Sequence, residues 1–159
     1  MFDPTTFTGF HTWLSLLALA SGAVTLAGLL SRRVPRGWTG AFLAFAIATS
    51  VTGYGFPMTG VITPAQVVGA LALAILAAAL LARHGRRPAT YAACLVASEY
   101  LLAFVAVAQA FQKVPALAAL GQGGFGAAQL IVLAGFLVLG VAVVRRFRGR
   151  ALRPFRQVA

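Results

Sequence analysis

The residues of this chain that could do chemistry are few, and the most prominent is an acid inside an apolar run. Asp3 and Glu99 are the only carboxylate side chains, and Glu99 lies near the middle of its run. An ionised carboxylate is costly in a bilayer, so Glu99 should be protonated, paired or facing a polar cavity. It is a candidate functional residue. The alternative is a neutral acid that hydrogen-bonds to a neighbouring helix, a contact worth about 0.6 kcal/mol on average.

Histidine offers a second kind of chemistry. His11 begins the first apolar run and could titrate near neutral pH or bind a metal or haem iron. The other histidine, His84, belongs to a connection that we expect at the opposite membrane face, so the two cannot clamp one haem. We therefore predict that His11 is a hydrogen-bonding interfacial residue, with no cofactor and no metal site.

Polar side chains gather toward one end of the apolar runs. On a helix, Glu99, Gln109 and Lys113 share a sector of about 100°. His11 and Tyr54 belong to the same end of their own runs. Such a group is either an interfacial belt or the mouth of a pocket for a lipophilic molecule with a polar head. The candidate ligand-binding residues are His11, Tyr54, Glu99, Tyr100, Gln109 and Lys113.

The sequence lacks the patterns of common catalytic sites. It contains no Ser-His-Asp set, no HExxH, no paired carboxylates and no phosphate-binding glycine loop. We interpret Gly121-Gln122-Gly123-Gly124 as a linker. Cys94 is the only cysteine, so an intramolecular disulfide is impossible. We predict no catalytic residues, and we regard an enzyme as less favoured than a binding protein.

The elements that must position these residues are five apolar stretches. Hydrophobic residues make up 60% of the chain and charged residues only 9%, against about 25% in soluble domains. Each stretch is long enough, at ~1.5 Å per residue, to approach the ~30 Å hydrocarbon core as a helix. We predict an all-α integral membrane bundle, a single transmembrane domain over 1–159. Its five spans should be at about 10–30, 38–56, 64–82, 89–112 and 126–144.

The basic residues predict the orientation of this bundle. Twelve of the 13 lie in the connections 31–37 and 83–88 and in the tail 145–159, and Lys113 is the exception. Because cytoplasmic loops collect Lys and Arg, the N-terminus should be outside and 145–159 a basic cytoplasmic tail. This topology explains the net charge of +11, so we do not expect a nucleic-acid partner. The segment 114–124 is too short to cross and should lie at the outer interface or between helices.

Several short runs of the sequence are distinctive. They are FHTWLS at 10–15, ATSVTG at 48–53 with FP at 56–57, QAFQKVPAL at 109–117, Gln129, and RRFR at 145–148. These runs resemble segments of a family of small multi-pass membrane proteins from proteobacteria. The resemblance extends over most of the chain and implies a bacterial inner membrane, but no activity. It also implies an amide at the position of Leu102 and an apolar residue at that of Glu99, which favours His11, Gln109 and Lys113 over Glu99.

Three functions fit these features. The first is a binding or transport module for a lipid, quinone or similar amphiphile, with a pocket open to the outer face. The second is an accessory subunit that packs against a larger membrane complex through small-residue faces. The third is a redox or proton-handling enzyme that uses His11 and Glu99. In size and number of spans the chain is also similar to the translocator-protein family of tetrapyrrole and sterol binders, although it lacks that family's tryptophan-rich loops.

Overall fold

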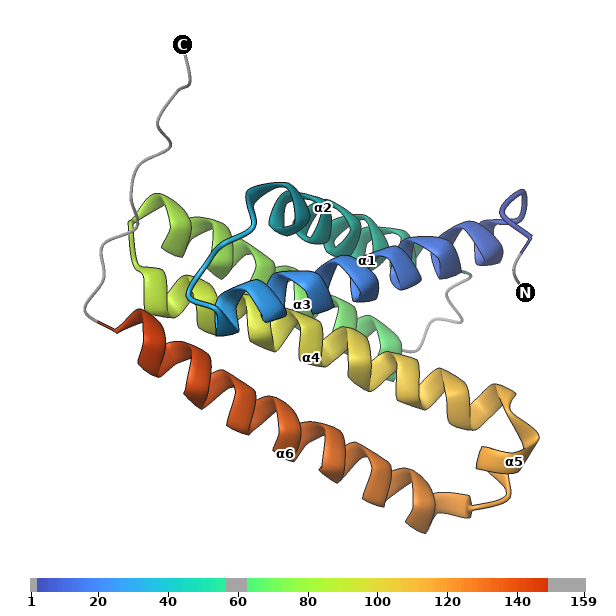
Figure 1. The fold of residues 1–159 in the computed structure, drawn as a ribbon. Coiled ribbons are helices and arrows are strands. Elements are labelled where there is room, and N and C mark those ends of the chain that lie inside the picture. Colours follow the sequence, from blue (N-terminus) through green and yellow to red (C-terminus); the bar gives the residue numbers. More distant parts are fainter. Residues whose placement is uncertain (1–2, 57–62, 149–159) are drawn as a thin grey trace.

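The long helices of this protein lie side by side, and successive ones run in opposite directions (Figure 1). The computed structural model describes residues 3–56 and 63–148, which form helices and turns without a strand. The all-helical prediction is confirmed for these residues. The elements are α1 (Phe7–Leu30), α2 (Arg36–Thr52), the 3-10 turn η1 (Gly53–Gly55), α3 (Pro64–His84), α4 (Pro88–Lys113), the short α5 (Pro115–Ala118) and α6 (Gly121–Phe147).

Four of the helices, α1, α3, α4 and α6, are long and apolar enough to cross a membrane. Their 21 to 27 residues match the ~20 that a crossing requires. Helix α2 has 17 residues and is continued by the three residues of η1. The fold is therefore a helical bundle with four candidate spans and one shorter helix packed among them.

Helix α4 is the centre of the bundle. It packs against α1, α3 and α6, while α2 pairs with α1 and α3. The four helices α1 to α4 enclose a core that includes Leu29, Phe42, Leu76 and Leu95. Helix α6 lies outside this group and contacts mainly α4. Of its residues only Val143 and Phe147 are buried, so most of its apolar surface faces outward.

Two turns at one end of the bundle use arginine where glycine is usual. Arg32 follows α1 with φ 56°, and Arg86 follows α3 with φ 54°. In each turn the next residue donates its N–H to a carbonyl five positions back, Arg33 to Gly28 at 2.9 Å and Arg87 to Ala82 at 2.8 Å. This is the Schellman arrangement, in which the left-handed position disfavours any side chain. Arginine therefore occupies both positions at an energetic cost.

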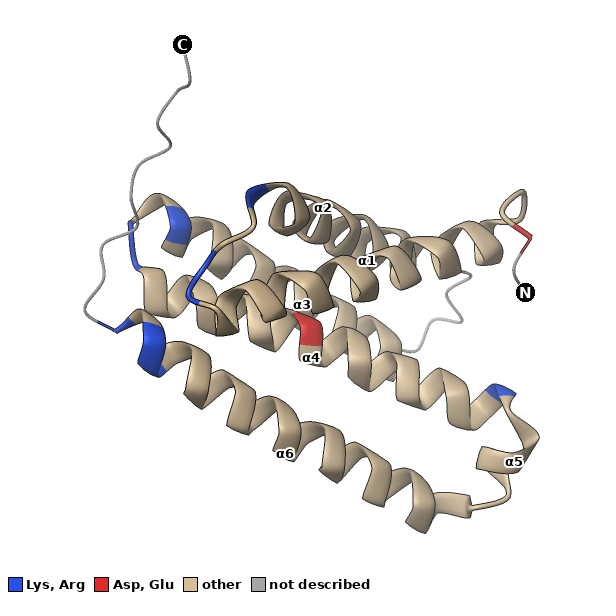
Figure 2. Ribbon diagram, viewed as in Figure 1, with Lys and Arg blue, Asp and Glu red and all other residues tan. Residues whose placement is uncertain are grey.

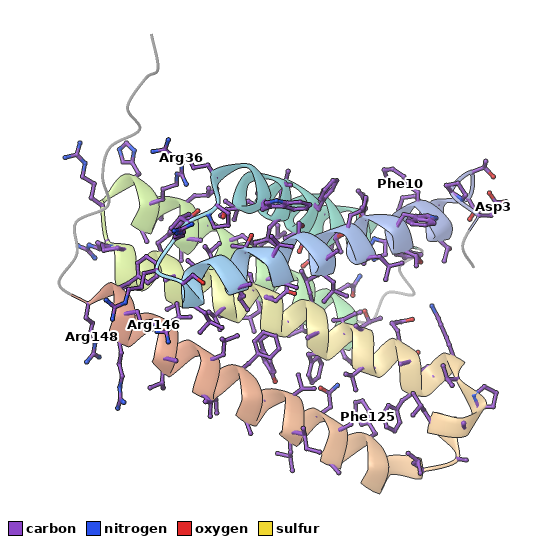
Figure 3. All side chains as sticks on the ribbon, viewed as in Figure 1. Asp3, Phe10, Arg36, Phe125, Arg146 and Arg148 are labelled. Carbon is purple, nitrogen blue, oxygen red and sulfur yellow. The ribbon has the colours of Figure 1, made fainter. Side chains whose placement is uncertain are left out.

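All the described arginines lie at this same end, which we call the basic end (Figure 2). Asp3 and Lys113 lie at the opposite end, and Glu99 is near the middle of α4. Figure 3 shows the same separation for Arg36, Arg146 and Arg148 against Asp3. The predicted grouping of the arginine-rich connections at one face of the bundle is thus present.

The prolines begin helices, as their missing amide leads one to expect. Pro64, Pro88 and Pro115 occupy the first turns of α3, α4 and α5, and Pro35 is the N-cap of α2. The Thr63 side chain also caps α3, because it accepts the Gln66 amide while the Gln66 side chain accepts the Thr63 amide. Pro57 lies outside the described residues.

The last helix is longer at both ends than predicted. Gly121-Gln122-Gly123-Gly124, interpreted as a linker, forms the first turn of α6 instead, and Gly121 has the positive φ of 61° at its start. The rest of segment 114–124 is the single turn α5 and its flanks. Arg145 and Arg146, assigned to the tail, belong to the last turn of α6. Helical hydrogen bonds continue past the apolar run because backbone groups there still need partners. Residues 149–159 of the predicted tail lie outside the described residues.

We predict that Arg86→Gly stabilises the protein by about 1 kcal/mol, because glycine adopts a positive φ without steric cost. The matched control is Arg87→Gly, which removes the same charge one residue later at an ordinary φ of −98°. The control should be neutral or destabilising. Unfolding by SDS in mixed micelles, followed by circular dichroism, compares the two. Equal effects of both substitutions would contradict the assigned role of backbone strain.

Candidate functional site

Glu99 is buried where three helices meet. It belongs to α4, is 4% exposed, and lies against Gly22 of α1 and the ring of Phe42 of α2. A methyl group on Gly22 would overlap Glu99 Oε2 and would lie 2.9 Å from Phe42 Cε2. The absence of a side chain at Gly22 is therefore what makes room for the carboxyl group.

The Glu99 carboxyl group is incompletely satisfied by the described residues. Its Oε2 is buried and has no hydrogen-bond partner among them. The hydroxyl oxygens of Ser98, Thr39 and Thr49 are buried in the same state. The described arginines lie at the basic end, far from the middle of α4 (Figure 2). A buried carboxyl group without a cationic partner is accommodated more easily as a neutral acid than as an anion. The predicted hydrogen bond to a neighbouring helix is not formed by Oε2 among the described residues.

At the end of the bundle opposite the arginines, His11 links α1 to α2. Its Nδ1 donates a hydrogen bond to Thr52 Oγ1 at 2.8 Å, since the Thr52 hydroxyl gives its own hydrogen to the Ala48 carbonyl. The His11 ring also meets Phe56 edge to face at 5.2 Å. These contacts join α1 to α2, as expected for a hydrogen-bonding interfacial histidine.

The other predicted site residues are distributed over different surfaces. Tyr54 donates from its hydroxyl to the Gln66 carbonyl of α3 at 2.8 Å. Gln109 and Lys113 are exposed at the outer part of α4. Tyr100 faces α6, where its ring packs on Phe136 at 5.7 Å. The structure therefore assigns Glu99 and Tyr100 to different faces of α4.

A groove lies between α4 and α6 that the sequence did not indicate. Its volume is about 510 Å³, within the range of about 300–1,000 Å³ typical of ligand sites. It exists because small residues, Ala93 and Ala97 on α4 and Gly140 on α6, leave space between the helices. Tyr100 and Phe136 line its inner part, and Arg145 and Arg148 line its other end.

The groove is almost entirely apolar apart from its arginine end. Val96, Leu133, Leu137, Val141 and Val144 complete its walls. Beyond it, toward the end opposite the arginines, two side-chain contacts link α4 to α6. Gln129 Nε2 donates to the Phe104 carbonyl at 3.0 Å, and Phe111 meets Phe125 at 5.5 Å. The groove is therefore confined to the half of the interface nearer the basic end.

Of the six predicted ligand-binding residues, Tyr100 is the one that lines this groove. The groove residues of α6 follow helical spacing, but so do other residues of this helix, which is apolar on every side. The groove residues of α6 are spaced three and four positions apart and end at Arg145 and Arg148. This spacing indicates one face of a helix, but it does not indicate that α4 lies against that face.

The described residues contain no candidate metal site, and comparison with known proteins found no match. Within 3–56 and 63–148, no three His, Cys, Asp or Glu side chains come together in a way that could hold a metal ion. Compared with known proteins, the chain matches no family profile, no curated protein and no solved structure. The resemblance to small proteobacterial membrane proteins stays a prediction.

We predict that Gly22→Ala destabilises the protein by about 1–3 kcal/mol, because the added methyl group overlaps the Glu99 carboxyl. Glu99→Ala should remove much of that cost, so the double variant should be more stable than the sum of the single effects predicts. Gly135→Ala is the control, since a methyl group there meets nothing within 4 Å. SDS unfolding of the unmodified protein, the two single variants and the double variant measures the coupling, and Gly135→Ala is unfolded beside them. A cost of Gly22→Ala that is independent of Glu99 would contradict the contact.

Proposed function

We propose that this protein is a five-span protein of the bacterial inner membrane that binds an amphiphilic molecule in the groove between α4 and α6. The observation that carries the proposal is the groove itself, which combines apolar walls with two arginines at one end. A ligand with an apolar body and a polar head has this same division. The N-terminus lies outside and the arginine-rich end is cytoplasmic.

The fifth crossing is assigned to α2 with η1. Together they comprise 20 residues, Arg36–Gly55, which meets the ~20 that a crossing requires. The α1–α2 and α3–α4 turns both lie at the basic end (Figure 2). If α2 did not cross, these two arginine-rich turns would be separated by the bilayer, which conflicts with the preference of Arg for the cytoplasmic side.

The strained arginines support the orientation. Arg32 and Arg86 occupy left-handed positions where glycine would cost less. Positive charge at these turns therefore outweighs backbone preference, as expected where charge determines the direction of insertion. Anionic lipids of the cytoplasmic leaflet add a further attraction to the same residues.

The groove is a better candidate site than the end of the bundle that holds His11. There, His11 and Tyr54 already have hydrogen-bond partners on neighbouring helices. Gln109 and Lys113 are exposed on the surface of α4. The groove instead offers about 510 Å³ of space with an apolar lining. We therefore retain the predicted ligand class and move its site to the α4–α6 interface.

The topology is tested with single cysteines in a Cys94→Ala background. We expect Ser31→Cys and His84→Cys to react with a membrane-impermeant maleimide only in inverted vesicles, and Ala119→Cys only in intact cells. These three positions are exposed in the turns at the two ends of the bundle. Labelling of His84→Cys from outside would reduce the number of spans to four. Reversal of all three patterns would overturn the orientation.

Ligand binding is tested by filling the groove. Gly140→Leu should reduce the lipophile recovered with the purified protein severalfold, because the new side chain extends into the groove beside Val96. Gly135→Leu adds the same side chain to α6 outside the groove and should have little effect. Mass spectrometry of extracted ligand provides the measurement, and circular dichroism verifies folding. Loss with His11→Ala but not with Gly140→Leu would return the site to the outer face.

A further inference from the structure

We propose that the groove binds an anionic phospholipid from the leaflet at the basic end, with an acyl chain between α4 and α6 and the phosphate at Arg145 and Arg148. This inference rests on the proposed function, because it identifies the ligand of the same groove. It adds the chemical class of the head group and the leaflet from which the ligand comes.

The length of the groove matches one leaflet. Its lining on α6 extends from Leu133 to Arg148, 15 residues along the helix. At a rise of ~1.5 Å per residue this is about 22 Å. A whole bilayer with its head groups is about 40–45 Å thick, so one leaflet is about 20–22 Å. An acyl chain that reaches Tyr100 and Phe136 from the basic end would therefore have its head group at the level of the arginines.

The two arginines are arranged to bind one anion. Arg145 and Arg148 are three residues apart, so they lie on the same side of α6. Both line the groove and both side chains are exposed. Arg146 is a close neighbour but does not line the groove. Guanidinium groups bind phosphate oxygens through paired, charge-assisted hydrogen bonds, which suits a phosphodiester at this position.

No acidic side chain of the protein is available to these arginines. The chain has two, Asp3 and Glu99. Asp3 is at the far end of the bundle, and Glu99 is near the middle of α4 (Figure 2). Glu99 is also buried against Gly22 and Phe42, on the side of α4 that faces α1. An anion bound to Arg145 and Arg148 therefore meets no competing carboxylate side chain, and a negatively charged head group complements the site.

The walls of the groove favour a flexible chain over a rigid ring system. They are built mainly from aliphatic side chains along both helices, and the Tyr100 and Phe136 rings lie in the part farther from the arginines. An acyl chain that is already in the bilayer gains little hydrophobic free energy when it enters the groove. Selectivity among membrane lipids must therefore come from the head group, through the arginines.

The test uses the full-length protein in nanodiscs that contain either phosphatidylglycerol or phosphatidylcholine, with bound lipid counted by native mass spectrometry. We expect a preference for phosphatidylglycerol that falls about fivefold for each of Arg145→Gln and Arg148→Gln. Arg146→Gln is the matched control, because it removes the same charge from the same helix turn without altering the groove. It should leave the preference nearly unchanged.

The outcomes separate this inference from the proposed function. Equal retention of both lipids, with loss on Gly140→Leu, would overturn the anionic head group but support an amphiphile in the groove. Retention of neither lipid would overturn both. An equal effect of Arg146→Gln would assign the preference to general surface charge and overturn the inference. Displacement of the lipid by millimolar glycerol phosphate would identify a site for a soluble phosphate instead.

Discussion

The constraint on which this structure depends is that a backbone in hydrocarbon must satisfy its hydrogen bonds within its own segment. The long apolar runs satisfy this constraint by forming helices. Their polar side chains then lie either at the ends of the bundle or in its interior. The arginines take one end. His11 and Tyr54 lie at the other end, where the hydrogen bond of His11 links α1 to α2 and that of Tyr54 links η1 to α3. Glu99 is the ionisable acid that is buried in the interior of the bundle.

Helix α4 separates the two candidate features of the protein by its two faces. Glu99 and Tyr100 are consecutive, so their side chains diverge by about 100° around the helix. Glu99 is enclosed against α1 and α2, where Gly22 makes close approach possible. Tyr100 faces α6 at the inner limit of the groove. A compact, incompletely hydrogen-bonded contact and an open apolar groove thus share one helix without sharing space.

The loose attachment of α6 explains why the groove exists. Without a hydrophobic drive between helices in lipid, association depends on packing and on a few polar links. The half of α6 opposite the basic end has such links, in Gln129 with the Phe104 carbonyl and in the Phe111 and Phe125 rings. In the half nearer the basic end, Val143 and Phe147 are buried, and small residues on α4 face Gly140 and leave the groove beside this contact. The arginines at the end of α6 therefore lie beside an apolar groove.

The sequence alone determined the helices, most of their ends and the gathering of arginines at one face, because these follow from local hydropathy, proline positions and charge order. It did not determine the start of α6, because Gly121-Gln122-Gly123-Gly124 has the composition of a linker. In the structure these residues form the first turn of α6, continuous with the helix that follows. The sequence also singled out Glu99 and Tyr100 without separating their roles. The Gly22 contact and the groove were decided by tertiary structure alone, because both join residues far apart in the chain. Helix α6 is apolar on all sides, so no periodicity in its sequence could indicate which face meets α4.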